Sequence, residues 1–229
     1  PNKPFAVLFT KNLVRDIANG WALYGTSEAK DEWLVFPWEG DESGSSDDIA
    51  TRLLQFIGED PDREGLRETP QRAMKAWGEW CSGYRYTPSD VLKTFEDGAE
   101  RYDEMVLVKD IPVYSHCEHH MSPFFGVAHV GYIPDKSIIG LSKIPRLVDI
   151  FARRLQVQER LTVQVAEALV DALKPKGVGV MLQCRHLCME SRGVERSRLV
   201  TVTTALRGGF KEGTARDEFL KTINSRGSV

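Results

Sequence analysis

The feature that most constrains this fold is the placement of its histidines and cysteines in two short segments. All five histidines and three of the four cysteines lie between His116 and Cys188. Residues 116–120 read His-Cys-Glu-His-His, and residues 184–188 read Cys-Arg-His-Leu-Cys. Thiolate sulfur and imidazole nitrogen are ligands that zinc prefers. We therefore expect the fold to bring these two segments together.

Composition indicates an ordinary globular protein. The chain has 229 residues, of which 41% are hydrophobic, and a net charge of −3. That charge gives no indication of a nucleic-acid or anionic-membrane partner, and the apolar runs are too short to cross a bilayer. The first residues lack the features of a signal peptide, and four cysteines make no dense disulfide framework. We predict a cytoplasmic protein with no nucleic-acid or membrane partner.

A polar, Gly/Ser-rich stretch at Gly40–Ser46 predicts a domain boundary. Residues 1–46 are interpreted as an appendage and linker of unknown role, with a strand at Phe5–Phe9 and a helix at Lys11–Leu23. Residues 47–229 are expected to form the main domain. It is divided into a helical hairpin at 47–100 and an α+β part at 101–229.

Two helices are predicted in the hairpin region. The first begins at Asp47 or Asp48 and runs through Ile57, with Ile49 and Leu53 on the same face. The second begins at Thr69-Pro70, where Thr would be the capping residue and Pro would take the first helical position.

The remainder alternates between strand and helix patterns. Period-two segments rich in Val and Thr predict strands, and apolar residues at steps of three and four predict helices. The strands cover 104–109, 124–133, 178–188 and 198–206, with 111–115 as either the continuation of the first strand or its neighbour. One helix starts at 142, and two others cover 156–174 and 214–223. This order predicts an α+β fold, with antiparallel strands and a pair of helices on one face.

The two segments together suggest a metal site. Cys117 and His120 are three residues apart, so one turn can present both to a metal. On a strand, Cys184, His186 and Cys188 would share a face. Two sulfurs and one nitrogen suit zinc, and three protein ligands leave a fourth position for water, as in catalytic sites.

The alternative is a closed structural site in which Cys184 or His116 is the fourth ligand. The surplus histidines His119 and His186 favour the catalytic interpretation, because histidine beside a metal-bound water is suited to acid–base work.

A second candidate site lies at two helix starts. Ser142, Lys143 and Arg146 place a hydroxyl and two cations where backbone N–H groups favour anions. Glu159 opens the next helix with a carboxylate. Taken singly, Ser142 as an N-cap and Glu159 as a partner of the helix dipole are the commoner roles.

These motifs, in this order, resemble the GTP cyclohydrolase I family. The resemblance runs from about Asp48 to Ile223. It rests on the following segments: Glu68–Arg72, Cys117–His120, Gly140–Lys143, Gln156–Leu161, His186–Cys188, Ser191–Val194 and Arg216–Leu220.

The resemblance implies an enzyme that converts GTP to 7,8-dihydroneopterin triphosphate and formate, the first step of pterin or folate-type biosynthesis. It also implies the tunnelling fold, an antiparallel sheet backed by two helices, and a toroidal homodecamer with active sites at subunit interfaces. Zinc would be bound by Cys117, His120 and Cys188.

The family motifs also imply roles for other residues. His119 would give a proton to the imidazole ring nitrogen of guanine as that ring opens, and His186 would assist at the same centre. Ser142 would act on the ribose in the later rearrangement. The implied substrate-binding residues are Glu159 for guanine, Gln158 beside it, Lys143, Arg146 and Arg192 for the triphosphate, and Arg72 and Lys75 from a neighbouring subunit.

Two other functions fit parts of the pattern. A nitrile reductase of the same fold would use a single activated cysteine and a nicotinamide, rather than a Cys/His/Cys set. A catalytically inactive zinc-binding module would not need His119, His186 and Glu159, which are all present.

Overall fold

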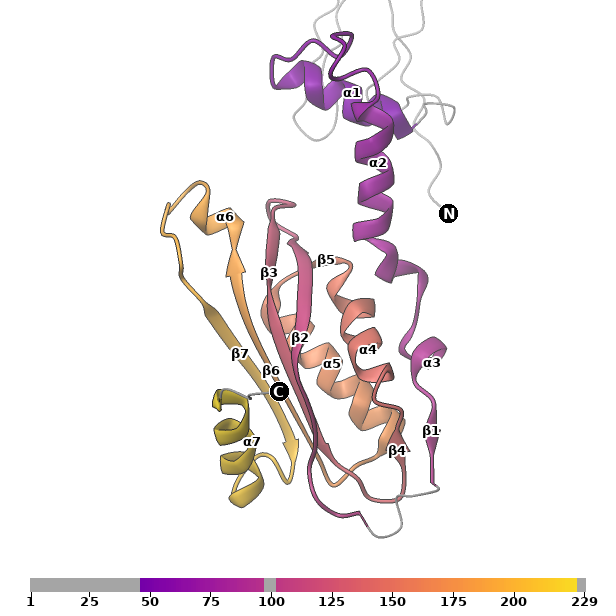
Figure 1. Cartoon of the computed structure of the whole chain (residues 1–229), viewed down its shortest axis with the longest axis vertical. Coiled ribbons are helices and arrows are strands. Elements are labelled where there is room, and N and C mark those ends of the chain that lie inside the picture. Colours follow the sequence, from indigo (N-terminus) through magenta and orange to yellow (C-terminus); the bar gives the residue numbers. More distant parts are fainter. Residues whose placement is uncertain (1–45, 97–101, 226–229) are drawn as a thin grey trace, which may run out of the picture.

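The computed structural model describes residues 46–96 and 102–225 (Figure 1). The strand and helix predicted at Phe5–Phe9 and Lys11–Leu23 lie outside the described residues. Within the described part, an elongated helical region leads into a sheet layered with helices. No helix there has the length and apolarity that crossing a bilayer requires.

The N-terminal region contains the two predicted helices, α1 (Ser46–Phe56) and α2 (Thr69–Trp80), which contact each other. The predicted cap of α2 is wrong by one residue: Glu68 is the cap, because its carbonyl already accepts a hydrogen bond from Arg72 N at 3.1 Å. Three short elements follow α2: η1 (Ser82–Arg85), α3 (Pro88–Val91) and β1 (Thr94–Phe95).

Five strands form the main sheet in the order β5-β2-β3-β6-β7. Their bounds are β2 (Val106–Cys117), β3 (Pro123–Ile133), β5 (Leu155–Gln156), β6 (Gly177–His186) and β7 (Thr201–Gly208). All neighbours are antiparallel except the short β5, which runs parallel to β2. A separate pair joins β1 to β4 (Ile138–Ile139).

Of the two alternatives for 111–115, continuation of the strand predicted at 104–109 is confirmed, because both segments belong to one strand, β2. Its register with β3 shifts between Val108 and Ile111, and Asp110 there has a φ of 58°. The extra residue of a bulge reverses which face the side chains take. A strict alternation rule therefore divides this strand in two.

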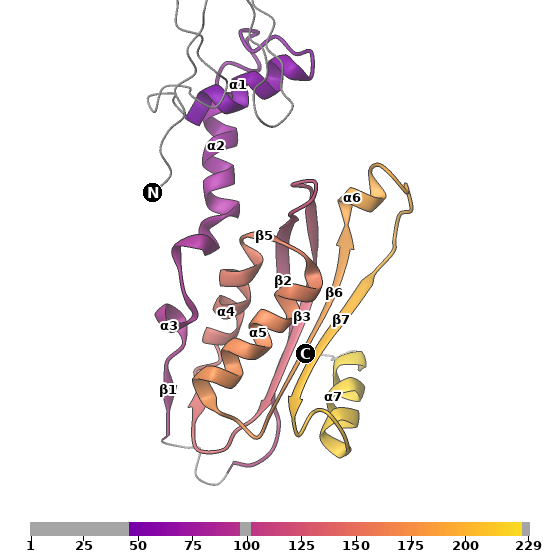
Figure 2. The same cartoon turned by 180° about the vertical axis from the view of Figure 1, so that it is seen from behind.

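Helices α4 (Lys143–Ala152) and α5 (Gln158–Leu173) cover one face of the sheet, as Figure 2 shows. Their apolar faces, including Leu147 and Val165, are fully buried against strand residues such as Val113 and Val180. The predicted α+β fold with a helix pair on one face is confirmed.

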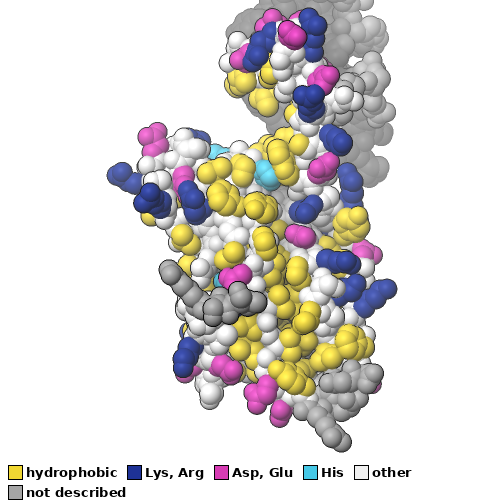
Figure 3. Space-filling model, viewed as in Figure 1, with side chains coloured by type: hydrophobic (Ala, Val, Ile, Leu, Met, Phe, Trp, Pro, Cys, Tyr) yellow, Lys and Arg dark blue, Asp and Glu magenta, His cyan; other side chains and the backbone are white. Residues whose placement is uncertain are grey.

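Helix α7 (Thr214–Asn224) covers part of the opposite face. Phe219 and Phe210 pack there over Gly179, where a Cβ would lie 2.8 Å from the Phe210 ring. Among the described residues, hydrophobic side chains gather along the rest of this face (Figure 3). Tyr114, for example, is 72% exposed.

The sheet has two ends with different contents. The turn from β2 to β3 and the C-terminal end of β6 lie at one end, which we call the metal end. At the opposite end β3 leads into β4, and α4 begins there. Helix α4 then runs back toward the metal end, where β5 pairs with His116 and Cys117. Its ten residues span about 15 Å.

Candidate metal centre and active site

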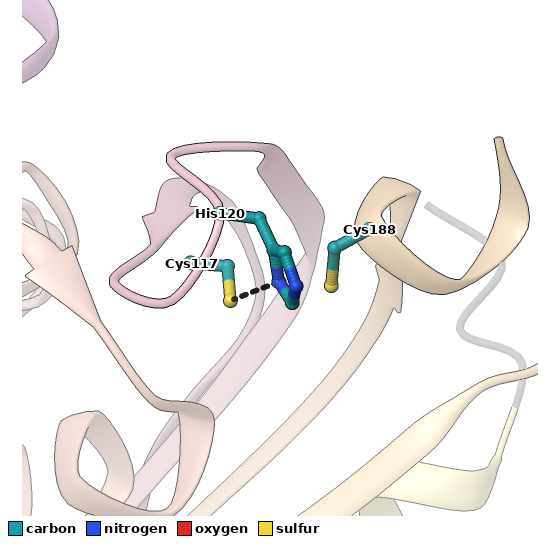
Figure 4. Close-up of side chains that lie close together, drawn as sticks. All are labelled: Cys117, His120 and Cys188. Carbon is teal, nitrogen blue, oxygen red and sulfur yellow. Dashed lines mark hydrogen bonds between the residues drawn. The ribbon is translucent and has the colours of Figure 1, made fainter. Parts of the chain in front are cut away.

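Three side chains meet at the metal end: Cys117 at the end of β2, His120 in the following turn, and Cys188 (Figure 4). Their ligand atoms all lie within 4.8 Å of one another. The Cys117 sulfur is 4.0 Å from His120 Nδ1. Among the described residues, this is the only group of three or more His, Cys, Asp or Glu side chains close enough to hold a metal ion.

A tight turn explains why Cys117 and His120 face each other. Met121 N donates to Cys117 O, and Cys117 N donates to Ser122 O, both at 2.8 Å. Met121 takes a left-handed conformation with a φ of 52°. Glu118 N donates to Gln156 O at 3.0 Å, which ties the turn to the end of β5.

Cys188 reaches the group from a helical turn. The prediction that it lies on a strand with Cys184 and His186 is wrong, because β6 ends at His186 and α6 (Leu187–Glu190) begins directly after it. Continuing the β3–β6 register would pair Leu187 with Pro123, which has no N–H to donate. The helical turn therefore replaces the strand just where Cys188 must turn toward β2.

An ion pair connects the end of β6 with the helical turn α6. Arg185 forms a two-point ion pair with Glu190, whose side chain is nearly buried. This pair connects the last strand residues to the end of α6, and its hydrogen bond lowers the pKa of the Glu190 carboxyl.

The donor set fits zinc. In a tetrahedral site with Zn–S near 2.3 Å and Zn–N near 2.1 Å, ligand atoms lie about 3.5–3.8 Å apart, slightly closer than here. Burial and the neighbouring Cys117 raise the pKa of the Cys188 thiol. Bringing two thiolates together therefore calls for a compensating cation, which a divalent metal supplies.

Neither candidate for a fourth protein ligand joins the group. Cys184 is 1% exposed in the apolar core, and burial raises the pKa of its thiol to about 12. The His116 ring packs against Trp77 and Trp80, at centroid distances of 4.9 and 5.1 Å. Within the described chain, the set is open, with three ligands.

His119 lies beside the metal ligands on the same turn. Its Nδ1 is 3.8 Å from the Cys117 sulfur, its Nε2 is 3.9 Å from Glu118 Oε1, and 64% of its side chain is exposed. Glu118 also pairs with Arg160, and that hydrogen bond lowers the pKa of the Glu118 carboxyl. A histidine with this exposure can meet a ligand bound over the cysteines.

His186 and the start of α5 complete the metal end. The His186 ring stacks on Phe124 at 4.6 Å and 11°, and its Nε2 lies 2.8 Å from Gln158 Oε1. Burial lowers the pKa of His186, while the charges of Glu159 and Glu190 oppose that change. Glu159 itself is exposed beside it.

The predicted cations are spread over the molecule. Arg192 is close enough to Cys188 for its charge to oppose the rise in the thiol pKa. Ser142, Lys143 and Arg146 begin α4 at the opposite end of the sheet. A single chain therefore does not gather these groups around the metal ligands.

Arg72 and Lys75 lie on α2. The C-terminal part of this helix packs on His116 at the metal end, and the rest of the helix projects away from the sheet (Figure 1). Arg72 pairs with Glu68, and both side chains are exposed.

Comparisons with known proteins agree with this geometry. The family model of GTP cyclohydrolase I matches residues 47–224. The chain belongs to the GTP cyclohydrolase I family. It is 58% identical over 175 residues to GTP cyclohydrolase 1 of Nitrosospira multiformis, covering 76% of this chain and 92% of that protein.

Two further relatives carry the same name. The Janthinobacterium protein is 56% identical, covering 76% of this chain and 90% of its own length, and the Campylobacter jejuni (strain RM1221) protein is 51% identical, covering 80% and 96%. A solved archaeosine synthase QueF-like structure in the apo form is 21% identical, with a TM-score of 0.38, covering 46% of this chain and 95% of that one.

Several features of this GTP cyclohydrolase I family member were not found from the sequence. The Glu118–Arg160 and Trp77–His116 contacts join residues 42 and 39 positions apart, so no local pattern reveals them. Gln158 was expected to bind substrate, and its side chain is buried and hydrogen-bonded to protein groups. Gln158 is the first residue of α5, and nothing in the local sequence shows that its side chain turns into the protein.

Proposed function

We propose that this protein converts GTP to 7,8-dihydroneopterin triphosphate and formate with the help of bound zinc, as the first step of a pterin or folate-type pathway. Family membership over residues 47–224 carries the proposal. The open three-ligand group supports it, because hydrolysis requires a position for water that a closed structural site would fill.

Cys117, His120 and Cys188 would hold the zinc. When bound in such a site, zinc lowers the pKa of a coordinated water to about 7 and so supplies hydroxide at neutral pH. The protein contributes the two thiolates and the tight turn that fixes the imidazole.

His119 would donate a proton to the guanine ring nitrogen as the C8–N bond breaks. Its exposure and its place beside Cys117 support this role. Glu118, which pairs with Arg160, lies next to His119, with its Oε1 3.9 Å from His119 Nε2. His186 would assist by holding or moving a proton at the same centre.

Glu159 would recognise guanine. A carboxylate accepts two hydrogen bonds, one from the ring N–H and one from the exocyclic amine. Its exposed position beside His186 supports this role.

The triphosphate and ribose would be bound with help from other copies of the chain. We propose that Ser142, Lys143 and Arg146 of one copy approach the metal end of another, where Arg192 already lies. Arg72 and Lys75 on the projecting α2 would reach a neighbour in the same way. Arginine suits this task because its guanidinium binds phosphate at two points.

A homodecamer is the assembly we propose. Its support is the exposed apolar surface, since such patches mark contact sites. On α1, Ile49, Leu53 and Phe56 are exposed, the last at 87%, and the sheet face that carries α7 adds Tyr114. All four cysteines are free thiols, which fits the reducing cytoplasm that we propose as its location.

A direct assay tests the proposed activity. Zinc-loaded protein is mixed with GTP, and formate release and pterin fluorescence are followed together; chelated, metal-free protein is the control. We expect equal amounts of formate and pterin, with neither product in the control. Zinc-loaded protein that leaves the guanine spectrum unchanged would contradict the proposal.

A further inference from the structure

We propose that Gln158 is a positioning residue that holds His186 in one tautomer, with hydrogen on Nε2 and the lone pair on Nδ1. This inference rests on the proposed role of His186 in the reaction of GTP. It replaces the expected substrate-binding role of the Gln158 side chain with a role inside the protein.

The orientation of the Gln158 amide is determined by its surroundings. Its nitrogen lies 3.2 Å from Leu182 O, 3.0 Å from Thr201 O and 3.0 Å from Thr203 Oγ1. Two of these partners are backbone carbonyls, which can only accept hydrogen bonds. With the amide reversed, its oxygen would face two other acceptors. The nitrogen must therefore lie on this side.

This orientation decides the tautomer of His186. The amide oxygen lies 2.8 Å from His186 Nε2 and can only accept a hydrogen bond. His186 Nε2 must then carry the hydrogen. In the neutral ring the lone pair is left on Nδ1, which makes Nδ1 the single atom of His186 that can accept a proton.

Both partners are held rigidly. Gln158 is 1% exposed, and its backbone carbonyl accepts a hydrogen bond from Thr162 Oγ1 at 2.7 Å. Thr162 and Thr203 share a further contact of 2.7 Å. The His186 ring is fixed by its stacking on the fully buried Phe124. Buried groups therefore fix both the plane of the His186 ring and the position of its hydrogen.

The Gln158 amide has no capacity left for a ligand. Its two N–H groups already serve three acceptors, and its oxygen is taken by His186. An outer partner that orients a working imidazole is a recognised means of fixing its tautomer. His119, which is exposed, has no comparable buried partner among the described residues.

The parent protein alone can test the tautomer. Zinc-loaded protein labelled with ¹⁵N in its histidine rings is measured by solid-state NMR, and the His186 signals are identified by their loss in His186→Asn. We expect a protonated Nε2 and an unprotonated Nδ1 in the neutral ring. The reverse tautomer, or a mixture of the two, would overturn the inference.

A double-mutant cycle tests the positioning role. We expect Gln158→Leu to lower kcat about ten- to a hundredfold, as misplaced catalytic groups do, with KM and zinc content nearly unchanged. In a His186→Ala background the same change should cost no further activity. Thr203→Val is the matched control: it removes one acceptor of the amide but keeps the contact with His186, so kcat should stay within about twofold.

The outcomes separate this inference from the proposed function. A Gln158→Leu variant that raises only KM, or whose loss adds fully to that of His186→Ala, would contradict the positioning role. Parent protein that releases no formate from GTP would overturn the proposed function instead, while the tautomer measurement, which needs no turnover, would still decide the Gln158 inference.

Discussion

The two ends of the sheet are built for different tasks. The metal end holds Cys117, His120 and Cys188 within 4.8 Å of one another, supported by hydrogen bonds between neighbouring elements. Toward the opposite end, Lys143 and Arg146 lie in the first turn of α4, a ten-residue helix about 15 Å long. One chain therefore brings the three candidate metal ligands together, whereas these cations lie away from them at the start of α4.

The two ends differ in whether their functional groups come together within one chain. The metal end needs only an ion, because its ligands converge within one chain. We propose that the cations act on a second copy, because helix α4 separates them from the metal ligands of their own chain. Substitutions at the two ends should accordingly separate loss of metal from loss of substrate binding.

The largest effect is expected from Cys188→Ser at the metal end. It removes one of three ligands, so zinc and turnover should both be lost. Zinc content is measured per chain alongside formate release. Cys81→Ser, which changes a cysteine outside the ligand group, is the control and should keep both. One zinc per chain in Cys188→Ser would contradict the ligand assignment.

The next effect separates chemistry from metal binding. His119→Ala should keep zinc and fold but lower kcat about a hundred- to ten-thousandfold, the usual contribution of a positioned acid or base. The measurement pairs zinc content with single-turnover kinetics. Near-normal turnover of GTP would show that another group supplies the proton.

A smaller effect is expected in guanine recognition. Glu159→Gln places an amide donor opposite a donor of guanine, leaving a group that guanine covers on binding unpaired at a cost of about 1–3 kcal/mol. Affinity for GTP, measured by calorimetry, should fall accordingly, while zinc content stays the same. Equal affinity of variant and parent would remove Glu159 from the guanine site.

The smallest effect on activity is expected from a substitution at the start of α4. Lys143→Ala removes one charged phosphate contact, so KM for GTP should rise about tenfold, with zinc unchanged. Lys174→Ala, which removes a lysine paired with Asp171 on the surface, is the control and should leave KM unaffected. Equal KM values in the two variants would argue against a phosphate role for Lys143.

The sequence predicts the fold well where its pattern is periodic. The apolar faces of α4 and α5, including Ile144 and Leu161, are buried as their spacing indicates. The prediction from the sequence fails at Cys188, where the alternation of side chains predicts that the strand continues. The strand ends there because its next partner would be Pro123, a fact that depends on the pairing of β3 with β6.

In the candidate site, too, the sequence predicts local features but not those that depend on contacts between distant elements. Cys117 and His120 form a local motif, so the sequence reveals their proximity. The packing of His116 on Trp77 and the burial of Gln158 depend on how distant elements meet, and spacing alone left His116 open as a ligand. The separation of Lys143 from the metal end also requires the path of α4.

Mixed oligomers test most directly whether the two ends work together across copies. Cys188→Ser keeps the opposite end intact, and the double variant Lys143→Ala/Arg146→Ala keeps the metal end intact. Each should be nearly inactive alone. Parent protein taken through the same unfolding and refolding is the control for recovery.

We predict that co-refolding the two variants in equal amounts restores about a quarter of the parent activity, since that share of interfaces pairs two intact ends. The mixed state of the oligomers is verified by native mass spectrometry. Mixed oligomers that stay as inactive as the separate variants would contradict a site shared between copies.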